Sequence, residues 1–183
     1  MKFIVQSIPE VVLIEPNVYN DNRGYFVETF RQDLFEEAIG YPINFIQDNE
    51  SKSTKGVLRG LHYQLPPYTQ AKLVRVIEGN VLDVAVDIRK SSPTFGQHVA
   101  VELTAESKNQ LFIPHGFAHG FVTLSKTAIF SYKVDNYYAP EYERCIAYND
   151  KQLNINWVVQ EECLQISKKD LNSISFFEVV VPF

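Results

Sequence analysis

Short β-type segments separated by turn residues restrict what this chain can fold into. The stretch 73–89, LVRVIEGNVLDVAVDIR, has a turn around Gly79 and then a regular alternation of apolar and polar residues. Because successive side chains of a strand point to opposite faces, the alternation directs one set to a core and leaves Asp83 on the other face. Only residues 31–39, RQDLFEEAI, have helical spacing, and Gly40 can end that helix. We therefore predict an all-β sandwich or barrel with one or two short helices.

Length, charge and cysteine content exclude several classes of protein. The 183 residues, of which 45% are apolar, suffice for a single domain over 1–183. A formal net charge of −5 lacks the basic field of a nucleic-acid surface, so we expect no nucleic-acid partner. The early apolar runs, FIVQSI and VVLI, are too short for a signal peptide or a membrane span. Cys145 and Cys163 have neither metal-ligand spacing nor a nucleophile context, so we expect reduced thiols, no membrane partner and a cytoplasmic location.

The stretch 56–79, GVLRGLHYQLPPYTQAKLVRVIEG, places many polar side chains among β-type residues. On a regular strand His62 and Gln64 share a face, whereas Arg59 falls on the other face unless a bulge at Gly60 redirects it. Two interpretations follow from the residues. The stretch is either an ordinary edge strand with solvated charges or one wall of a polar pocket.

A metal in that pocket is the first hypothesis that four histidines raise. A catalytic metal needs about three converging protein ligands, commonly His with a carboxylate. Metal-binding cupin barrels supply them as two histidines two positions apart, a following Glu and a later His. Here Gln64 takes the place of the second His, and Lys72 stands where the carboxylate would be. We therefore predict no metal.

A proton-transfer site is the second hypothesis. His62 could face one barrel mouth together with Arg59, Lys72, His119 and Tyr132, and two cations beside a proton-transfer pair suit an anionic or enolate intermediate. Carboxylates commonly orient histidines, so Asp170 in ISKKD could do this, although a late KKD is also typical of a solvated loop. An inward Asp83 could likewise simply pair with an Arg or a His.

Seven motifs in a consistent order resemble the nucleotide-sugar epimerase family typified by dTDP-4-dehydrorhamnose 3,5-epimerase. They are DNRGYFVETF, FIQDNES, VLRGLHYQ, QAKLVRVIEGNVLDVAVDIRKSSPTFG, LFIPHGFAHGF, FSYKVDNYYAPEYE and ISKKD. The resemblance covers nearly the whole chain. It implies a cupin-like β-barrel (jelly roll) and a homodimer with strands exchanged between subunits. It also implies an isomerase that uses neither a metal nor an organic cofactor.

The resemblance also implies roles for individual residues. His62 would be the general base with Asp170 as its partner, and Tyr132 the acid on the opposite face of the sugar. Lys72 and Arg59 would stabilise the oxygen of the 4-keto group as it becomes an enolate. Phe26 would lie beside the thymine. The remaining positions expected to bind the nucleotide sugar are Arg23, Glu28, Gln47, Asn49, His119, Glu143 and Lys169.

The implied reaction inverts C3 and C5 of dTDP-4-dehydro-6-deoxy-D-glucose to give dTDP-4-dehydro-L-rhamnose, a step in dTDP-L-rhamnose biosynthesis toward surface polysaccharide. The chain departs from the family at Arg144-Cys145-Ile146 and in its apolar ending FFEVVVPF, which we expect to form a strand over a sheet edge or a dimer surface. The departures keep open a mono-epimerase, acting at C3 or C5 of another nucleotide-linked 4-keto-6-deoxysugar. A non-catalytic sugar-nucleotide-binding cupin and a metal-dependent cupin oxygenase are the rivals of other classes.

Overall fold

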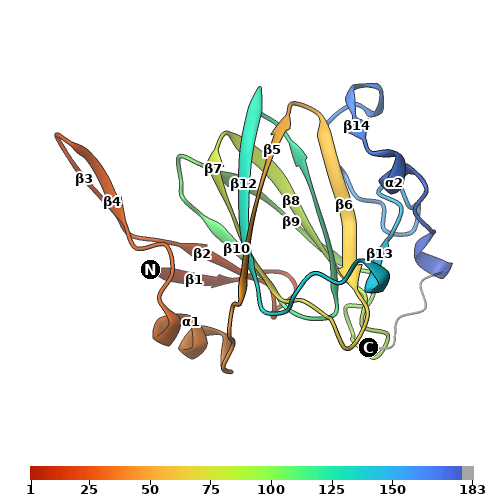
Figure 1. The fold of residues 1–183 in the computed structure, drawn as a ribbon, viewed down its shortest axis with the longest axis horizontal. Coiled ribbons are helices and arrows are strands. Elements are labelled where there is room, and N and C mark those ends of the chain that lie inside the picture. The colour runs from red at the N-terminus through yellow and green to blue at the C-terminus, as the bar shows by residue number, and fades with distance from the viewer. Residues whose placement is uncertain (179–183) are drawn as a thin grey trace.

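Two six-stranded sheets face each other in the computed structural model, which describes residues 1–178 (Figure 1). The first sheet has the order β1 (Lys2–Val5), β2 (Val12–Glu15), β10 (Gln110–Ile113), β7 (Lys72–Glu78), β12 (Thr127–Val134) and β5 (Gln47–Thr54). The second has the order β13 (Glu143–Cys145), β6 (Val57–Gln64), β11 (Phe117–Thr123), β8 (Asn80–Asp87) and β9 (His98–Thr104), with β14 (Gln165–Ile166) added parallel to β6. The other strand pairs within residues 1–178 are antiparallel, which confirms the all-β prediction.

A two-stranded hairpin, β3 (Val18–Asp21) and β4 (Gly24–Val27), extends from the body of the barrel. Figure 1 shows it as an arm on the opposite side of the molecule from β6 and α2 (Lys168–Leu171). The sequence predicts Arg23 at the tip of this loop, and the structure confirms it: the Arg23 side chain is 85% exposed and pairs with Asp21. The arm therefore carries Arg23 away from the chain's own barrel.

The alternation in β8 separates two layers of core. Val84 and Val86 pack outward against the layer that contains Trp157, while Val81 and Ala85 face the space between the sheets. A third cluster lies under α1 (Gln32–Ile39) around the buried Phe35. Because both faces of β8 are covered, polar side chains on its inner face, Asp83 among them, are enclosed by protein.

The helices are short. The predicted helix 31–39 is present as α1, and Gly40 ends it in the left-handed conformation at φ 84°. The part of the chain that the structure describes also has three 3₁₀ helices: Pro140–Tyr142, Glu161–Cys163 and Phe176–Glu178. No helix within residues 1–178 is long and apolar enough to cross a bilayer.

The predicted strand at the apolar ending is wrong for residues 176–178, which form the last 3₁₀ helix. The backbone N–H of Phe176 donates to Asp150, and its ring packs on Phe95 with centroids 5.0 Å apart, so a side-chain carboxylate and an aromatic contact hold the segment instead of a strand neighbour. The remainder of that predicted strand, 179–183, lies outside the described residues.

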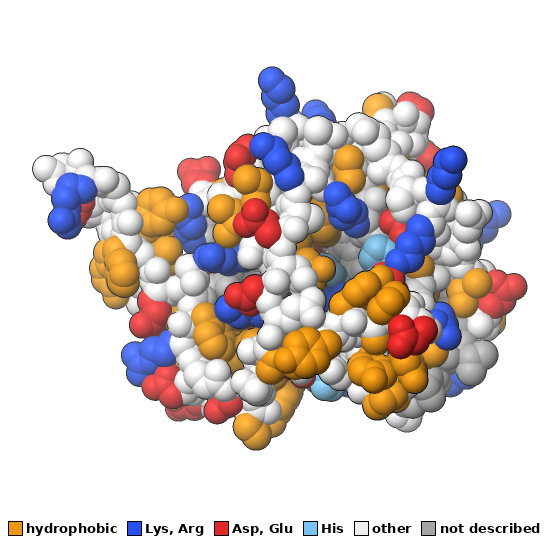
Figure 2. All heavy atoms as spheres, in the orientation of Figure 1, with side chains coloured by type: hydrophobic (Ala, Val, Ile, Leu, Met, Phe, Trp, Pro, Cys, Tyr) orange, Lys and Arg blue, Asp and Glu red, His pale blue; other side chains and the backbone are white. Residues whose placement is uncertain are grey.

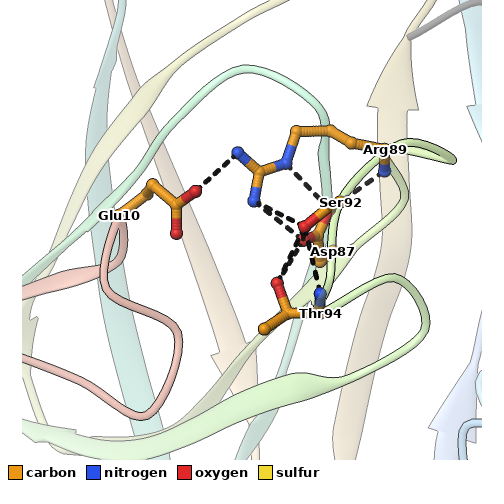
Figure 3. A network of polar contacts seen from close by, with 5 residues as sticks. All are labelled: Glu10, Asp87, Arg89, Ser92 and Thr94. Atoms are coloured by element: carbon orange, nitrogen blue, oxygen red, sulfur yellow. Dashed lines mark hydrogen bonds and ion pairs between the residues drawn. The ribbon is translucent and has the colours of Figure 1, made fainter.

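A buried polar network anchors the loop between β8 and β9 (Figure 3). Asp87 is fully buried and accepts hydrogen bonds from Arg89, Ser92 and Thr94, while Arg89 also pairs with Glu10. Burial opposes the charge on Asp87, but these hydrogen bonds outweigh it and lower its pKa to about 2. The network ties this end of β8 to the N-terminal segment, so the strand that carries Asp83 is held in place from outside the barrel.

A bulge in β6 determines where Arg59 and His62 point. His119 of β11 lies opposite His62 and Phe121 lies opposite Arg59, so a step of three residues on β6 faces a step of two on β11. Gly60 allows this because a Cβ there would lie 2.5 Å from the Cα of Gly120. The bulge predicted at Gly60 is thus confirmed.

The bulge generates a stability prediction. Gly60 has φ 122° and backbone against it, so Gly60→Ala combines strain with a clash, and we expect a loss of about 3 kcal/mol or more. Gly40→Ala is the matched control, because Gly40 also has a positive φ but open space around it, and should cost only about 1–2 kcal/mol. Denaturant unfolding of both variants measures the difference. Equal losses would contradict a steric role for the contact between Gly60 and Gly120.

Candidate active site

A cavity of about 240 Å³ lies between the two sheets at one mouth of the barrel. Figure 2 shows the hollow with histidine side chains at its floor and Lys and Arg side chains along its rim. Strands from both sheets and the segment after β12 contribute its walls. The lining residues are Ser51, Arg59, His62, Tyr63, Gln64, Gln70, Lys72, His119, Phe121, Phe130, Tyr132, Tyr138 and Glu143.

The wall formed by β6 carries a histidine–carboxylate pair. The Nε2 atom of His62 lies 2.7 Å from Oδ1 of Asp170, which α2 brings behind the strand. Burial opposes the charge on Asp170, but the hydrogen bond with His62 outweighs it and lowers the pKa of the carboxyl. His62 keeps 27% of its side chain exposed and Asp170 only 5%, so the histidine faces the cavity and the carboxylate acts through it. The predicted pairing is therefore present, and Asp170 is not a solvated loop residue.

Buried charges form the floor of the cavity. Nε2 of His119 lies 2.9 Å from Oδ2 of the fully buried Asp83, while Oδ1 of Asp83 has no hydrogen-bond partner within residues 1–178. Burial lowers the pKa of Lys72 to about 8, against the opposing effect of the Asp83 and Glu143 charges. Burial also lowers the pKa of His119, so this ring is neutral at pH 7 and donates its Nε2–H to Asp83. The floor of the cavity therefore presents the ammonium group of Lys72, whose positive charge the nearby carboxylates balance only partly.

The opposite wall carries a protonated phenol. Tyr132 comes from β12 of the first sheet, whereas His62 comes from β6 of the second. Burial and the nearby Glu143 charge raise the pKa of Tyr132, so its hydroxyl keeps its proton at neutral pH. Glu143 is ionised, because hydrogen bonds from Lys169 and Tyr138 outweigh its burial and lower its pKa. The imidazole of His62 and the phenol of Tyr132 thus stand on different sheets, and the Lys72 ammonium lines the same cavity.

Three predicted binding residues lie away from this cavity. Arg23 and Phe26 are on the β3–β4 arm, Glu28 follows it, and all three are exposed. Phe26 is 68% exposed, an unusual state for an aromatic residue on a strand. Within one chain the arm and the cavity are not brought together.

The other predicted binding residues lie at or beside the rim. Gln47 and Asn49 share the face of β5 that carries the lining residue Ser51, and Gln47 donates to Asn49. Lys169 is exposed and forms its ion pair with Glu143. Arg59 lines the cavity, and its guanidinium donates to Ser53.

Sequence reasoning missed two residues near the base. Tyr138 lines the cavity and donates its hydroxyl to Glu143, and the aromatic run NYY was its only signal. Cys145 is the cross-strand partner of His62, and its Sγ lies 3.8 Å from Oδ1 of Asp170. Neither cysteine has metal-ligand spacing along the chain, but the fold places Cys145 beside His62 and Asp170. Spacing along the chain could not reveal a neighbour that antiparallel pairing supplies.

Gln64, first paired with His62 by alternation, has a structural role. Its Nε2 donates to the carbonyls of Tyr68 and Tyr137, and its Oε1 accepts from the N–H of Ala139. The side chain therefore holds two loops at the cavity mouth, and both its amide nitrogen and its oxygen are engaged by backbone groups.

A larger hollow of about 810 Å³ lies between α1 and the barrel. It contains a second histidine–carboxylate pair, His115 with Asp135 at 2.7 Å. Asp135 also accepts the N–H of Ala71, so this pair braces a loop. Its one cation among the lining residues, apart from the histidine, is Arg89, which Asp87 and Glu10 already neutralise. We therefore place the chemistry in the smaller cavity.

A β-barrel with a histidine–carboxylate pair on one sheet, a phenol on the other and a buried ammonium in the same cavity has the groups that suit one class of enzyme: one that moves protons at a carbon next to a carbonyl. The comparisons with known proteins narrow the class. The model of the family described as dTDP-4-dehydrorhamnose 3,5-epimerase matches residues 5–178. The chain belongs to this family.

Individual relatives agree with the family model. The chain is 57% identical to the dTDP-4-dehydrorhamnose 3,5-epimerase of Shigella flexneri over 97% of both chains. The crystal structure of the Elizabethkingia anophelis enzyme of that name is 49% identical, with a TM-score of 0.93 and 97% of each chain covered. The Legionella pneumophila dTDP-6-deoxy-D-glucose-3,5-epimerase, solved with dTDP-4-keto-L-rhamnose, is 50% identical with a TM-score of 0.93, covering 97% of this chain and 94% of that one. The predicted cupin-like jelly roll, family and isomerase activity are confirmed.

The buried ammonium generates a prediction about pH. Because Lys72 has a pKa of about 8 instead of 10.5, it loses its charge as the pH rises through 8, and kcat/KM for epimerisation should fall there. Lys72→Arg keeps its charge at that pH, so its weaker activity should persist to higher pH while the acidic limb stays in place. Profiles of kcat/KM against pH for both proteins measure this. A basic limb at the same pH in Lys72→Arg would assign that limb to another group.

Proposed function

We propose that the cavity inverts C3 and C5 of dTDP-4-dehydro-6-deoxy-D-glucose to give dTDP-4-dehydro-L-rhamnose, with His62 as the base and Tyr132 as the acid. The observation that carries this proposal is the placement of these two groups on opposite sheets around the Lys72 ammonium. Membership of the 3,5-epimerase family supports the choice of substrate. Asp170, Arg59 and the rim residues have supporting roles.

The chemistry requires this arrangement. The C4 ketone acidifies the protons on C3 and C5, and His62 removes one of them from one face of the ring. The electron pair moves to the C4 oxygen and forms an enolate, which Lys72 and Arg59 stabilise. Tyr132 then protonates the same carbon from the opposite face, which inverts it. Asp170 stabilises the imidazolium, and solvent returns protons to the tyrosinate and removes them from His62 before the second centre reacts.

Two alternatives remain distinct from this proposal. A mono-epimerase would use the same groups on one carbon only, so exchange with solvent would be confined to that carbon. A sugar-nucleotide-binding protein without activity would have no use for a histidine–aspartate pair opposite a protonated phenol. The presence of both halves of the proton-transfer machinery favours an enzyme.

We also propose a homodimer in which the β3–β4 arm completes the cavity of the partner. The cavity of about 240 Å³ is below the range of roughly 300–1,000 Å³ for small-molecule sites, so it suits the sugar better than the whole nucleotide sugar. The arm carries an exposed cation and an exposed aromatic, Arg23 and Phe26, which suit a diphosphate and a base. An isologous pair of subunits would deliver both arms at once.

The state of the two cysteines bears on the cellular compartment in which the enzyme acts. Cys145 and Cys163 are both free thiols, which fits a reducing environment, and we propose that the enzyme acts in the cytoplasm. Its partners are then the nucleotide sugar and a second copy of itself. Neither the reaction nor the cavity calls for a metal or an organic cofactor, because the ketone of the substrate supplies the acidity.

Exchange in deuterated water tests the reaction. We expect proton NMR to show deuterium entering at both C3 and C5 with the wild-type enzyme. His62→Ala should lower the exchange rate ~10²–10⁴-fold because the base is lost. Tyr132→Phe should slow inversion more than proton removal, because the enolate still forms but lacks its acid.

The controls separate the readings. His115→Ala removes a histidine of an equally short carboxylate pair outside the cavity and should leave exchange unchanged. Exchange at one carbon alone would support a mono-epimerase, and its absence at both would sink the proposed substrate. Equal losses of exchange and inversion in Tyr132→Phe would argue against the phenol as the opposite-face acid.

Mixing two inactive variants tests the shared site. We expect His62→Ala and the double variant Arg23→Ala/Phe26→Ala to be weak alone, measured below KM. Co-expressed, they form heterodimers with one intact site, and random pairing should restore about one quarter of the wild-type activity. If the arm served its own subunit, co-expression would give no more activity than the two separate proteins.

A further inference from the structure

Three potential metal ligands meet behind the catalytic base. Glu143–Cys145 forms β13, and antiparallel pairing with β6 sets Cys145 directly opposite His62. Directly paired residues project to the same face of a sheet, where α2 supplies Asp170. Donor atoms of His62, Cys145 and Asp170 all lie within 4.8 Å of one another. No step of the proposed epimerisation uses the thiol.

We propose that His62, Cys145 and Asp170 form a binding site for Zn²⁺ whose occupation switches the enzyme off. Imidazole, thiolate and carboxylate are the ligands that Zn²⁺ prefers, and three protein ligands with one open position are typical of accessible zinc sites. The inhibitory half of this proposal rests on His62 being the base. The binding half does not.

The distances suit a tetrahedral zinc ion. Zn–S, Zn–N and Zn–O bonds imply donor–donor separations of roughly 3.3–3.7 Å. The separation of Cys145 Sγ from Asp170 Oδ1 is 3.8 Å, close to this range. The hydrogen-bonded pair of His62 Nε2 and Asp170 Oδ1 is 2.7 Å apart and must open by roughly half an ångström or more. Rotation of the partly exposed imidazole of His62 supplies that movement.

Access and charge also permit binding. A hollow of about 500 Å³, lined by Arg59, His62, Lys169 and Asp170 among others, opens beside the pair, between β6 and the segment that carries β14 and α2. The Lys169 ammonium, the nearest opposing cation on α2, is paired with Glu143. Burial raises the pKa of the Cys145 thiol to about 12, so the thiol is protonated in the free enzyme. It releases one proton to solvent as the Zn–S bond forms.

Binding at this place removes the base from the reaction. The ion occupies Nε2 of His62 and takes the carboxylate that otherwise stabilises the imidazolium. A metal on one ring nitrogen also lowers the proton affinity of the other. Zinc therefore acts on the proton-transfer step without entering the sugar cavity, and inhibition should lower kcat as well as kcat/KM.

Two readouts with the full-length, chelator-treated enzyme test the site. In the first, Zn²⁺ is titrated during the deuterium-exchange assay, and we expect complete inhibition at one ion per subunit. In the second, Co²⁺ replaces zinc, and a thiolate-to-cobalt charge-transfer band should appear without any need for activity. Cys145→Ser removes the soft ligand and should weaken inhibition at least ~10-fold, abolish the band and leave activity without metal unchanged.

Cys163→Ser is the matched control, because Cys163 is the other free thiol and is exposed. It should keep both the inhibition and the band. A band that survives in Cys145→Ser, or one that disappears in Cys163→Ser, would overturn the site, as would equal zinc inhibition of Cys145→Ser and wild type. Because the wild-type band is read without catalysis, its absence rejects the metal site even if Cys145→Ser does not fold. A band that forms while activity persists rejects the inhibitory role.

Discussion

The close approach of Gly60 and Gly120 is the contact on which the site depends. With no side chain at either position, β6 gains one residue against β11, and the regular alternation of faces is interrupted at that point. Arg59 and His62, which a flat strand would send to opposite faces, then line one cavity. A cation and a base are thereby held by backbone geometry, which positions them more precisely than a loop could.

The rest of the site consists of charges that the fold buries at a cost. Lys72 and Asp83 are both buried between the sheets, where protein groups replace the lost hydration of each charge only partly. The shift in the pKa of Lys72 to about 8 expresses that cost. A buried ammonium group of this kind attracts negative charge strongly, so it can stabilise an enolate as that anion forms. His119 accommodates the charge of Asp83 without adding one of its own, because burial keeps the ring neutral.

Much of the fold could be predicted from local sequence patterns. Contacts between residues far apart in the sequence could not, because they depend on how the strands pair. The alternation of apolar and polar residues predicted the strands, Gly40 predicted the end of α1, and Gly60 predicted the bulge. Each of these features depends on residues that are close together in the sequence. The pairing of His62 with Asp170 joins residues 108 positions apart, so the residues alone left Asp170 as either an orienting carboxylate or a solvated loop residue, and the family resemblance favoured the pairing. Cys145 shows the limit most clearly. Its neighbour depends on the register of β13 against β6, which no spacing along the chain encodes.

The division of labour between strands and loops explains which parts of the chain are free to change. The groups proposed to move protons sit on paired strands or are bonded to them, so the sheets themselves fix their positions. The groups expected to hold the nucleotide lie on the exposed β3–β4 arm and along the rim, where substitutions disturb little packing. Departures from the family pattern such as Cys145 occur between the strands that carry the proposed proton-transfer groups and the exposed arm and rim. There a side chain can leave the cavity lining intact and still add a property, because Cys145 contacts Asp170 and is not among the residues that line the cavity.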